Sequence, residues 1–106
     1  MATNTRKAAL PEQDLTILAE TFRLLGDLNR LKILFFCIDA PKSVSEIAET
    51  LDLSQSLVSH NLRLLRGTRL VSGERQAKQV FYKVADEHVS DMLLDMLSHI
   101  DEEHDE

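Results

Sequence analysis

Apolar residues recur along the chain at intervals of three and four, the spacing of amphipathic helices. A first run ends at Gly26, and Asp27 is a suitable N-cap for a second helix. The apolar positions of these two predicted helices are Leu15, Leu18, Ala19, Phe22, Leu25, Leu28, Leu31, Leu34, Phe35 and Ile38. Residues 1–13 lack this period, so we expect them to form a flexible arm.

Two shorter helices follow, with a turn of about four residues between them, which is the spacing of a helix-turn-helix. Ser43 and Glu46 form a capping box at the start of the first, and the second begins near Ser54 or Ser56. We expect Gly67 to end it in a left-handed conformation. The inward-facing positions would be Ile47, Ala48, Leu51, Val58, Leu62 and Leu65.

Residues 70–75 and 80–84 are β-rich and flank a polar, basic tip, which predicts a β-hairpin, or wing, directly after the helix-turn-helix. A last helix, residues 86–102, has an apolar side made of Val89, Met92, Leu93, Met96, Leu97 and Ile100. The predicted fold is mainly α with a small β-hairpin: one winged helix-turn-helix domain with a folded core at 14–102 and an acidic tail at 103–106.

The net charge of −6 is unevenly distributed. Nine acidic residues and no Lys or Arg lie in residues 86–106, which leaves residues 1–85 with a net charge of +3. The segment Ser54–Lys83 alone carries +5, so it is a candidate interaction surface for a polyanion, although a basic face without a partner would have the same charge.

Composition excludes several classes of protein. No apolar run is long enough to span a membrane or serve as a secretory signal, and Cys37 is the single cysteine, so we expect a cytoplasmic protein without a disulfide or thiolate-rich metal site. No pairing of a nucleophile with a base is legible, which argues against an enzyme.

The second helix of the helix-turn-helix has the chemistry of a DNA-reading helix. Its short hydrogen-bonding side chains suit base edges in the major groove, whereas basic side chains further along and on the hairpin suit phosphates. The proposed base-facing residues are Ser54, Gln55, Ser56, Ser59, His60 and Asn61, and the proposed phosphate contacts are Arg63, Arg66, Arg75 and Lys78. The alternative is that these residues only cap and solvate a surface helix.

Two histidines of the last helix, His88 and His99, lie eleven residues apart and therefore nearly on one stripe. Their separation of about 16 Å along the axis prevents them from sharing a metal within one helix. Two antiparallel copies would bring His88 of one chain to His99 of the other, with Asp86 and Glu102 completing four nitrogen and oxygen ligands, the number that zinc takes. Alternatively, Asp86 is only an N-cap and Glu102 only part of the acidic tail.

Residues 24–34 and 53–65 resemble the ArsR/SmtB family of winged-helix repressors. The resemblance implies a homodimer joined through its terminal helices that binds a double-stranded DNA operator and releases it when an inducer binds. Asp86, His88, His99 and Glu102 look like the zinc site of the zinc-sensing branch, and the carbonyl of Arg69 like the partner through which His99 couples this site to the reading helix. Residues 43–47 lack the cysteines of the family's soft-metal sensors.

Two departures from the family leave alternatives open. Ala77 stands where the wing usually has glycine, and His104 is an additional potential ligand of the kind that accompanies nickel or cobalt sensing in some relatives. The ion could therefore be zinc, cobalt or nickel, and a repressor that responds to a non-metal signal through the same helix is a further alternative.

Overall fold

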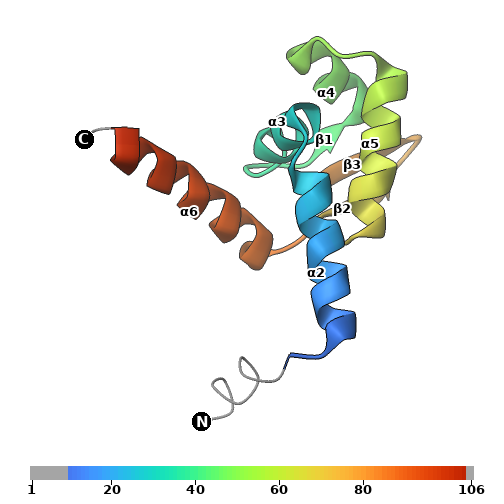
Figure 1. The fold of residues 1–106 in the computed structure, drawn as a ribbon. Helices are drawn as coiled ribbons and strands as arrows, with labels where there is room; N and C mark the ends of the chain where they lie inside the picture. Colours follow the sequence, from blue (N-terminus) through green and yellow to red (C-terminus); the bar gives the residue numbers. More distant parts are fainter. Residues whose placement is uncertain (1–9, 105–106) are drawn as a thin grey trace.

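The computed structural model describes residues 10–104. Five helices and three short strands follow one another in this part of the chain: α2 (Glu12–Leu25), α3 (Leu28–Phe36), β1 (Lys42–Ser43), α4 (Val44–Leu51), α5 (Gln55–Gly67), β2 (Val71–Gln76), β3 (Gln79–Val84) and α6 (Glu87–His104). The winged helix-turn-helix prediction is confirmed. Figure 1 shows α3, α4, α5 and the sheet as a body from which α2 and α6 project in different directions.

The first and last helices extend by two residues beyond the limits predicted for the folded core, 14–102. Helix α2 begins at Glu12, because Pro11 takes the N-cap position and accepts the first backbone hydrogen bond, from Leu15. Helix α6 continues to His104, beyond the predicted boundary at residue 102. The remainder of the predicted arm, residues 1–9, and of the predicted tail, residues 105–106, lies outside the described residues.

The sheet has the order β1-β3-β2 and is antiparallel throughout. Strands β2 and β3 form the predicted hairpin, in register from Val71 opposite Val84 to Gln76 opposite Gln79. Strand β1 was not predicted, because two residues are too few to show an alternating pattern. It pairs Lys42 with Tyr82 and so joins the start of α4 to the hairpin.

A single apolar core lies between α3, α4, α5 and the sheet, and its fully buried side chains include Leu24, Ile33, Leu34, Cys37, Ile47, Val58, Leu62 and Leu65. Helix α6 contacts β3 and contributes Leu93 to this core. The predicted inward faces of α4 and α5 are confirmed, apart from Leu51, which is partly buried.

Much of the apolar face predicted for the first and last helices is not covered within the chain. In α2 only Leu24 and Leu25 are buried, whereas Phe22 is 54% exposed. In α6, Ile100 is 58% exposed. The other large apolar side chains exposed on these two helices are Leu15, Ile17, Leu18, Leu94, Met96 and Leu97. Leu28, one of the apolar positions predicted for the second helix, is also exposed.

The end of α5 corrects another prediction. Gly67 is the last helical residue, and the left-handed residue is Arg69, with φ of 62°. The Leu70 N–H then donates to the Leu65 carbonyl at 2.8 Å, which closes the helix while both leucines are buried. The turn is therefore set by the burial of Leu70 and does not depend on a left-handed glycine. None of the helices in residues 10–104 is long and apolar enough to cross a membrane.

Candidate nucleic-acid interface and metal-binding helix

The helix-turn-helix is held by its predicted caps. The Glu46 N–H donates to Ser43 Oγ at 3.1 Å and the Ser43 N–H donates to Glu46 Oε1 at 3.2 Å, which confirms the capping box at the start of α4. Asp52 ends α4 in the left-handed region, with φ of 57°, and the Leu53 N–H donates to the Ala48 carbonyl at 2.9 Å. These bonds fix the short turn that sets α5 against α4.

The outer surface of α5 gathers most of the predicted reading residues. The helix begins after Ser54, whose Oγ accepts the Leu57 N–H at 3.1 Å; this bond uses a lone pair, so the hydroxyl proton can still donate to a ligand. Beyond it lies an open hollow of about 390 Å³ lined by Gln55, Ser56, Ser59, His60 and Arg63. The structure therefore brings these polar side chains together on one accessible surface.

Asn61 does not belong to this surface, contrary to the sequence-based expectation. It is 3% exposed, and its Oδ1 accepts a hydrogen bond from Arg30 Nη1 at 3.1 Å. The spacing already contained this signal, because Asn61 lies three residues after Val58 and four before Leu65, on the buried stripe. Arg66, by contrast, is exposed, as a phosphate contact requires.

The wing turns through two residues, Ala77 and Lys78, which connect the last paired residues of the hairpin, Gln76 and Gln79. Ala77 has φ of 58°, so the backbone adopts the conformation that favours glycine even though alanine is present. Arg75 and Lys78 are both exposed near this tip. Lys78 also lines a hollow of about 250 Å³ with residues 43–45 at the start of α4, so the wing tip and the helix-turn-helix border one surface.

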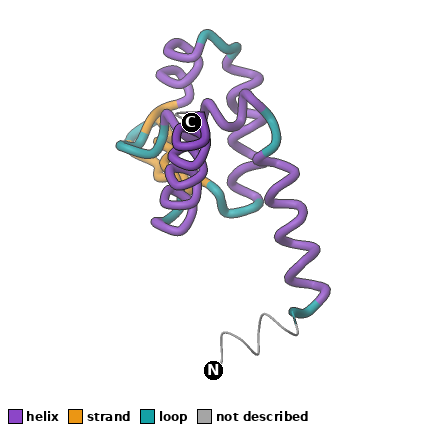
Figure 2. Tube along the Cα trace, turned by 60° about the vertical axis from the view of Figure 1, so that its left-hand side comes forward, coloured by secondary structure: helices purple, strands orange, loops and turns teal. Residues whose placement is uncertain are grey.

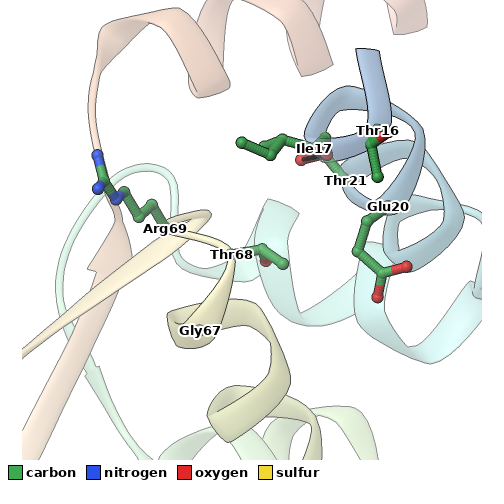
Figure 3. Close-up of a pocket in the computed structure, with 7 residues that line it drawn as sticks. All are labelled: Thr16, Ile17, Glu20, Thr21, Gly67, Thr68 and Arg69. Carbon is green, nitrogen blue, oxygen red and sulfur yellow. Dashed lines mark hydrogen bonds between the residues drawn. The ribbon is translucent and has the colours of Figure 1, made fainter. Parts of the chain in front are cut away.

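A third hollow, of about 530 Å³, lies between α2 and the end of α5. Figure 3 shows Thr16, Ile17, Glu20 and Thr21 on the α2 side and Gly67, Thr68 and Arg69 on the other. It is continuous with the exposed apolar face of α2, because Ile17 lines it. The backbone that follows the reading helix therefore faces the surface that α2 leaves uncovered.

Helix α6 carries the predicted metal ligands. Asp86 precedes the helix, and its Oδ1 accepts the Val89 N–H at 3.1 Å, so it is an N-cap as well as a candidate ligand. His88, His99 and Glu102 are exposed on the helix. Among the described residues of one chain, no three His, Cys, Asp or Glu side chains are close enough to hold a metal.

The position of these ligands relative to the apolar face matters for access. His99 follows the core residue Leu93 by six positions, which places it about 120° around the helix. The histidine stripe thus borders the apolar face of α6 and is not part of it. An ion could reach these side chains from solvent while the apolar face is covered.

Cys37 is not available as a metal ligand or reactive thiol. Its side chain is fully buried, and this burial raises the pKa of the thiol to about 11. Coordination and nucleophilic attack both need the thiolate, which this environment disfavours. The donor set available on the described surface is therefore imidazole nitrogen and carboxylate oxygen.

Comparison with known proteins agrees with this architecture. The sequence profile of "Bacterial regulatory protein, arsR family" matches residues 27–72, from the N-cap of α3 to the start of β2. The HTH-type transcriptional regulator NmtR of Mycobacterium tuberculosis is 35% identical over 95% of this chain and 84% of its own length. The chain belongs to the ArsR family. It is a DNA-binding transcriptional regulator and not an enzyme.

Other relatives of this ArsR-family chain include the transcriptional repressor SmtB homolog of Synechocystis sp., 35% identical over 80% of this chain and 64% of the relative. The solution structure of the homodimeric winged helix-turn-helix DNA-binding domain of Mb0332 from Mycobacterium bovis superposes with a TM-score of 0.77. It is 28% identical, and the match covers 93% of this chain and 87% of that one.

Proposed function

We propose that this ArsR-family regulator is a cytoplasmic repressor that binds a palindromic operator as a homodimer and releases it when zinc binds to α6. The observation that carries the DNA-binding part is the hollow on α5, where five polar side chains lie on one exposed face of a segment with a net charge of +5. A helix of this kind enters the major groove, and its position after the turn is that of a recognition helix.

Each part of this surface has its own role in the proposal. Gln55, Ser56 and Ser59, near the start of α5, donate to and accept from base edges, and Ser54 and His60 extend this contact. Arg63 and the wing residues Arg75 and Lys78 neutralise phosphates and so fix the register of the protein on the duplex.

The exposed apolar faces of α2 and α6 support the homodimer. Side chains such as Phe22 and Ile100 belong to helices that project from the body (Figure 1), where a second copy can cover them. Figure 2 views the C-terminal helix nearly along its axis, in front of the strands. Apolar surface of this extent is uncommon on a monomer. A two-fold arrangement places one reading helix on each side of the axis, which is why the operator would be palindromic.

The metal part of the proposal rests on the donor set of α6. Asp86 and His88 of one chain, with His99 and Glu102 of its partner copy in antiparallel arrangement, supply two imidazole nitrogens and two carboxylate groups, a set that fits zinc. Bound zinc would supply a charge that links the two helices. His99 would coordinate zinc through one ring nitrogen and donate a hydrogen bond with the other, and we propose the Arg69 carbonyl, just after α5, as the acceptor.

DNA binding is tested first. The probe is a labelled duplex selected from a randomised library by the protein, with fluorescence anisotropy as the measurement. Gln55→Ala and Ser59→Ala should weaken binding to this duplex, whereas Thr50→Ala, on the exposed side of α4, is the control. Equal affinity for all variants would contradict the assignment of α5.

Metal release is tested separately. Equilibrium dialysis should find two zinc ions per dimer, and zinc should release the selected duplex. His88→Ala and His99→Ala should bind the duplex but no longer respond to zinc, and Asp91→Asn, an exposed acid of α6 outside the proposed site, should respond normally. Zinc-dependent release by both histidine variants would contradict the site. A stronger response to nickel or cobalt would reassign the ion.

A further inference from the structure

Arg30, to which the proposed function assigns no role, connects three helices through one side chain. Its backbone N–H donates to Asp27 Oδ1 at 3.0 Å, so the N-cap of α3 fixes where the side chain starts. Its Nε donates to the Leu24 carbonyl at 2.7 Å, and its Nη1 donates to Asn61 Oδ1 at 3.1 Å. The guanidinium therefore joins the end of α2, the start of α3 and the middle of α5.

The acceptor on α5 lies on the inner side of the reading helix. Asn61 directly follows His60, which lines the outer hollow, but Asn61 itself is buried. A buried amide costs free energy unless it is hydrogen-bonded, and every fully buried side-chain polar atom of the described residues has a partner. An apolar residue would suit this core position better for stability alone, so the amide has a directional role: it fixes where α5 lies relative to Arg30.

The acceptor on α2 lies where that helix joins the body. Leu24 belongs to the last turn of α2, whose carbonyls have no partner within their own helix. Leu24 and Leu25 are the buried residues of α2, whereas the rest of the helix exposes its apolar face. A change in the angle of α2 would displace the Leu24 carbonyl, and the guanidinium that binds this carbonyl also binds Asn61.

We propose that Arg30 is a positioning residue for DNA reading: it sets the orientation of α5 relative to α2, and thereby the spacing of the two reading helices in the dimer. This inference rests on the proposed function, in which α5 reads the operator and α2 lies in the dimer interface. Arginine suits the task because its planar fork directs separate N–H groups at two acceptors, whereas the ammonium of lysine is a single point donor.

The test compares Arg30→Gln and Asn61→Leu with the wild type on the selected duplex and on an unrelated duplex. Each variant should bind the selected duplex about tenfold more weakly, an effect of about 1.4 kcal/mol. The double variant should be no weaker than the weaker single one, because both changes break the same link. Affinity for the unrelated duplex should not change. Arg23→Gln, in an exposed ion pair with Glu20, is the matched control.

Salt dependence separates positioning from direct contact. Affinity for DNA falls as salt rises, and loss of one phosphate contact makes the slope of log affinity against log salt shallower by about one. Arg63→Gln should show this shallower slope, whereas Arg30→Gln should keep the wild-type slope. A shallower salt dependence of Arg30→Gln would overturn the proposal. Wild-type affinity for the selected duplex in folded Arg30→Gln and Asn61→Leu would also overturn it.

Circular dichroism and thermal melting show which variants are folded. Should Arg30→Gln fail to fold, Arg30→Lys, which keeps the charge, replaces it, and wild-type affinity of that variant overturns the proposal. The outcome is distinct from failure of the proposed function, which Gln55→Ala and Ser59→Ala report. If those two bind normally, α5 does not read bases through its outer face, whatever Arg30→Gln does.

Discussion

Asp86 Oδ1 accepts the Val89 N–H at 3.1 Å, so the residue proposed to bind metal also caps α6. The two roles can be separated by substitution. Asn is as good an N-cap as Asp but lacks the charge. Asp86→Asn should therefore keep the helix and weaken zinc binding, whereas Asp86→Ala should weaken zinc binding and also lower stability by about 1 kcal/mol. Isothermal titration and thermal melting measure the two effects, and equal stability of the two variants would contradict a capping role.

The exposed apolar face of α2 should be needed for the chain to form a dimer. Phe22→Glu places a charge in the proposed dimer interface and should yield a monomer by analytical ultracentrifugation, with weaker binding to the selected duplex. Thr50→Glu introduces the same side chain on an exposed position of α4 and should remain dimeric. A dimeric Phe22→Glu would place the interface elsewhere.

The wing tip predicts an unusual effect of glycine. Ala77 has φ of 58°, where an alanine side chain is strained, so Ala77→Gly should stabilise the protein by up to about 1 kcal/mol. Ala40 is also exposed in a loop but has no positive φ, so Ala40→Gly should destabilise by a similar amount through the entropy of the unfolded chain. Thermal melting measures the change in stability of both variants. If both glycine substitutions change stability in the same direction, the backbone conformation of Ala77 has no energetic cost.

Burial of Cys37 gives the stability a dependence on alkaline pH. Its pKa rises from 9.0 to about 11 in the folded protein, so the unfolded chain ionises first and stability from this group falls as the pH rises from 9 to 11. Cys37→Ala should flatten this part of the profile relative to the wild type, measured by urea unfolding. Below pH 9 the native thiol should also resist a disulfide reagent that reacts at once with unfolded protein. Rapid labelling of the native state would contradict the burial.

Local signals in the sequence were sufficient to predict most of the fold. Asp27 and Ser43 cap their helices as predicted, and Ser54 is the cap of the two candidates, Ser54 and Ser56, because a cap depends on residues only a few positions apart. The hairpin was predicted for the same reason. Gly67 shows the limit, since burial of Leu70 and not the glycine determines the turn after α5.

Contacts between distant residues were beyond prediction. The bond from Arg30 to Asn61 joins positions 31 residues apart, and nothing in either local pattern indicates it. The spacing of apolar residues predicted that α2 and α6 each have an apolar face. It did not predict what covers that face, because the spacing within one helix contains no information about the helix that packs against it. Phe22 and Ile100 lie on the predicted apolar sides of their helices, and within one chain both are exposed.

The charges described above are separated in space as well as along the chain, since α5 and the acidic helix α6 lie on opposite sides of the body (Figure 1). With charge of opposite sign on α5 and α6, the field of a polyanion would exert a torque on the chain before any contact is made. The phosphates would repel a molecule that approaches DNA with α6 facing the duplex and attract one that approaches with α5 facing it. A chain with an excess of negative charge can thus approach DNA already turned the right way, and its association should slow as added salt shortens the reach of that field.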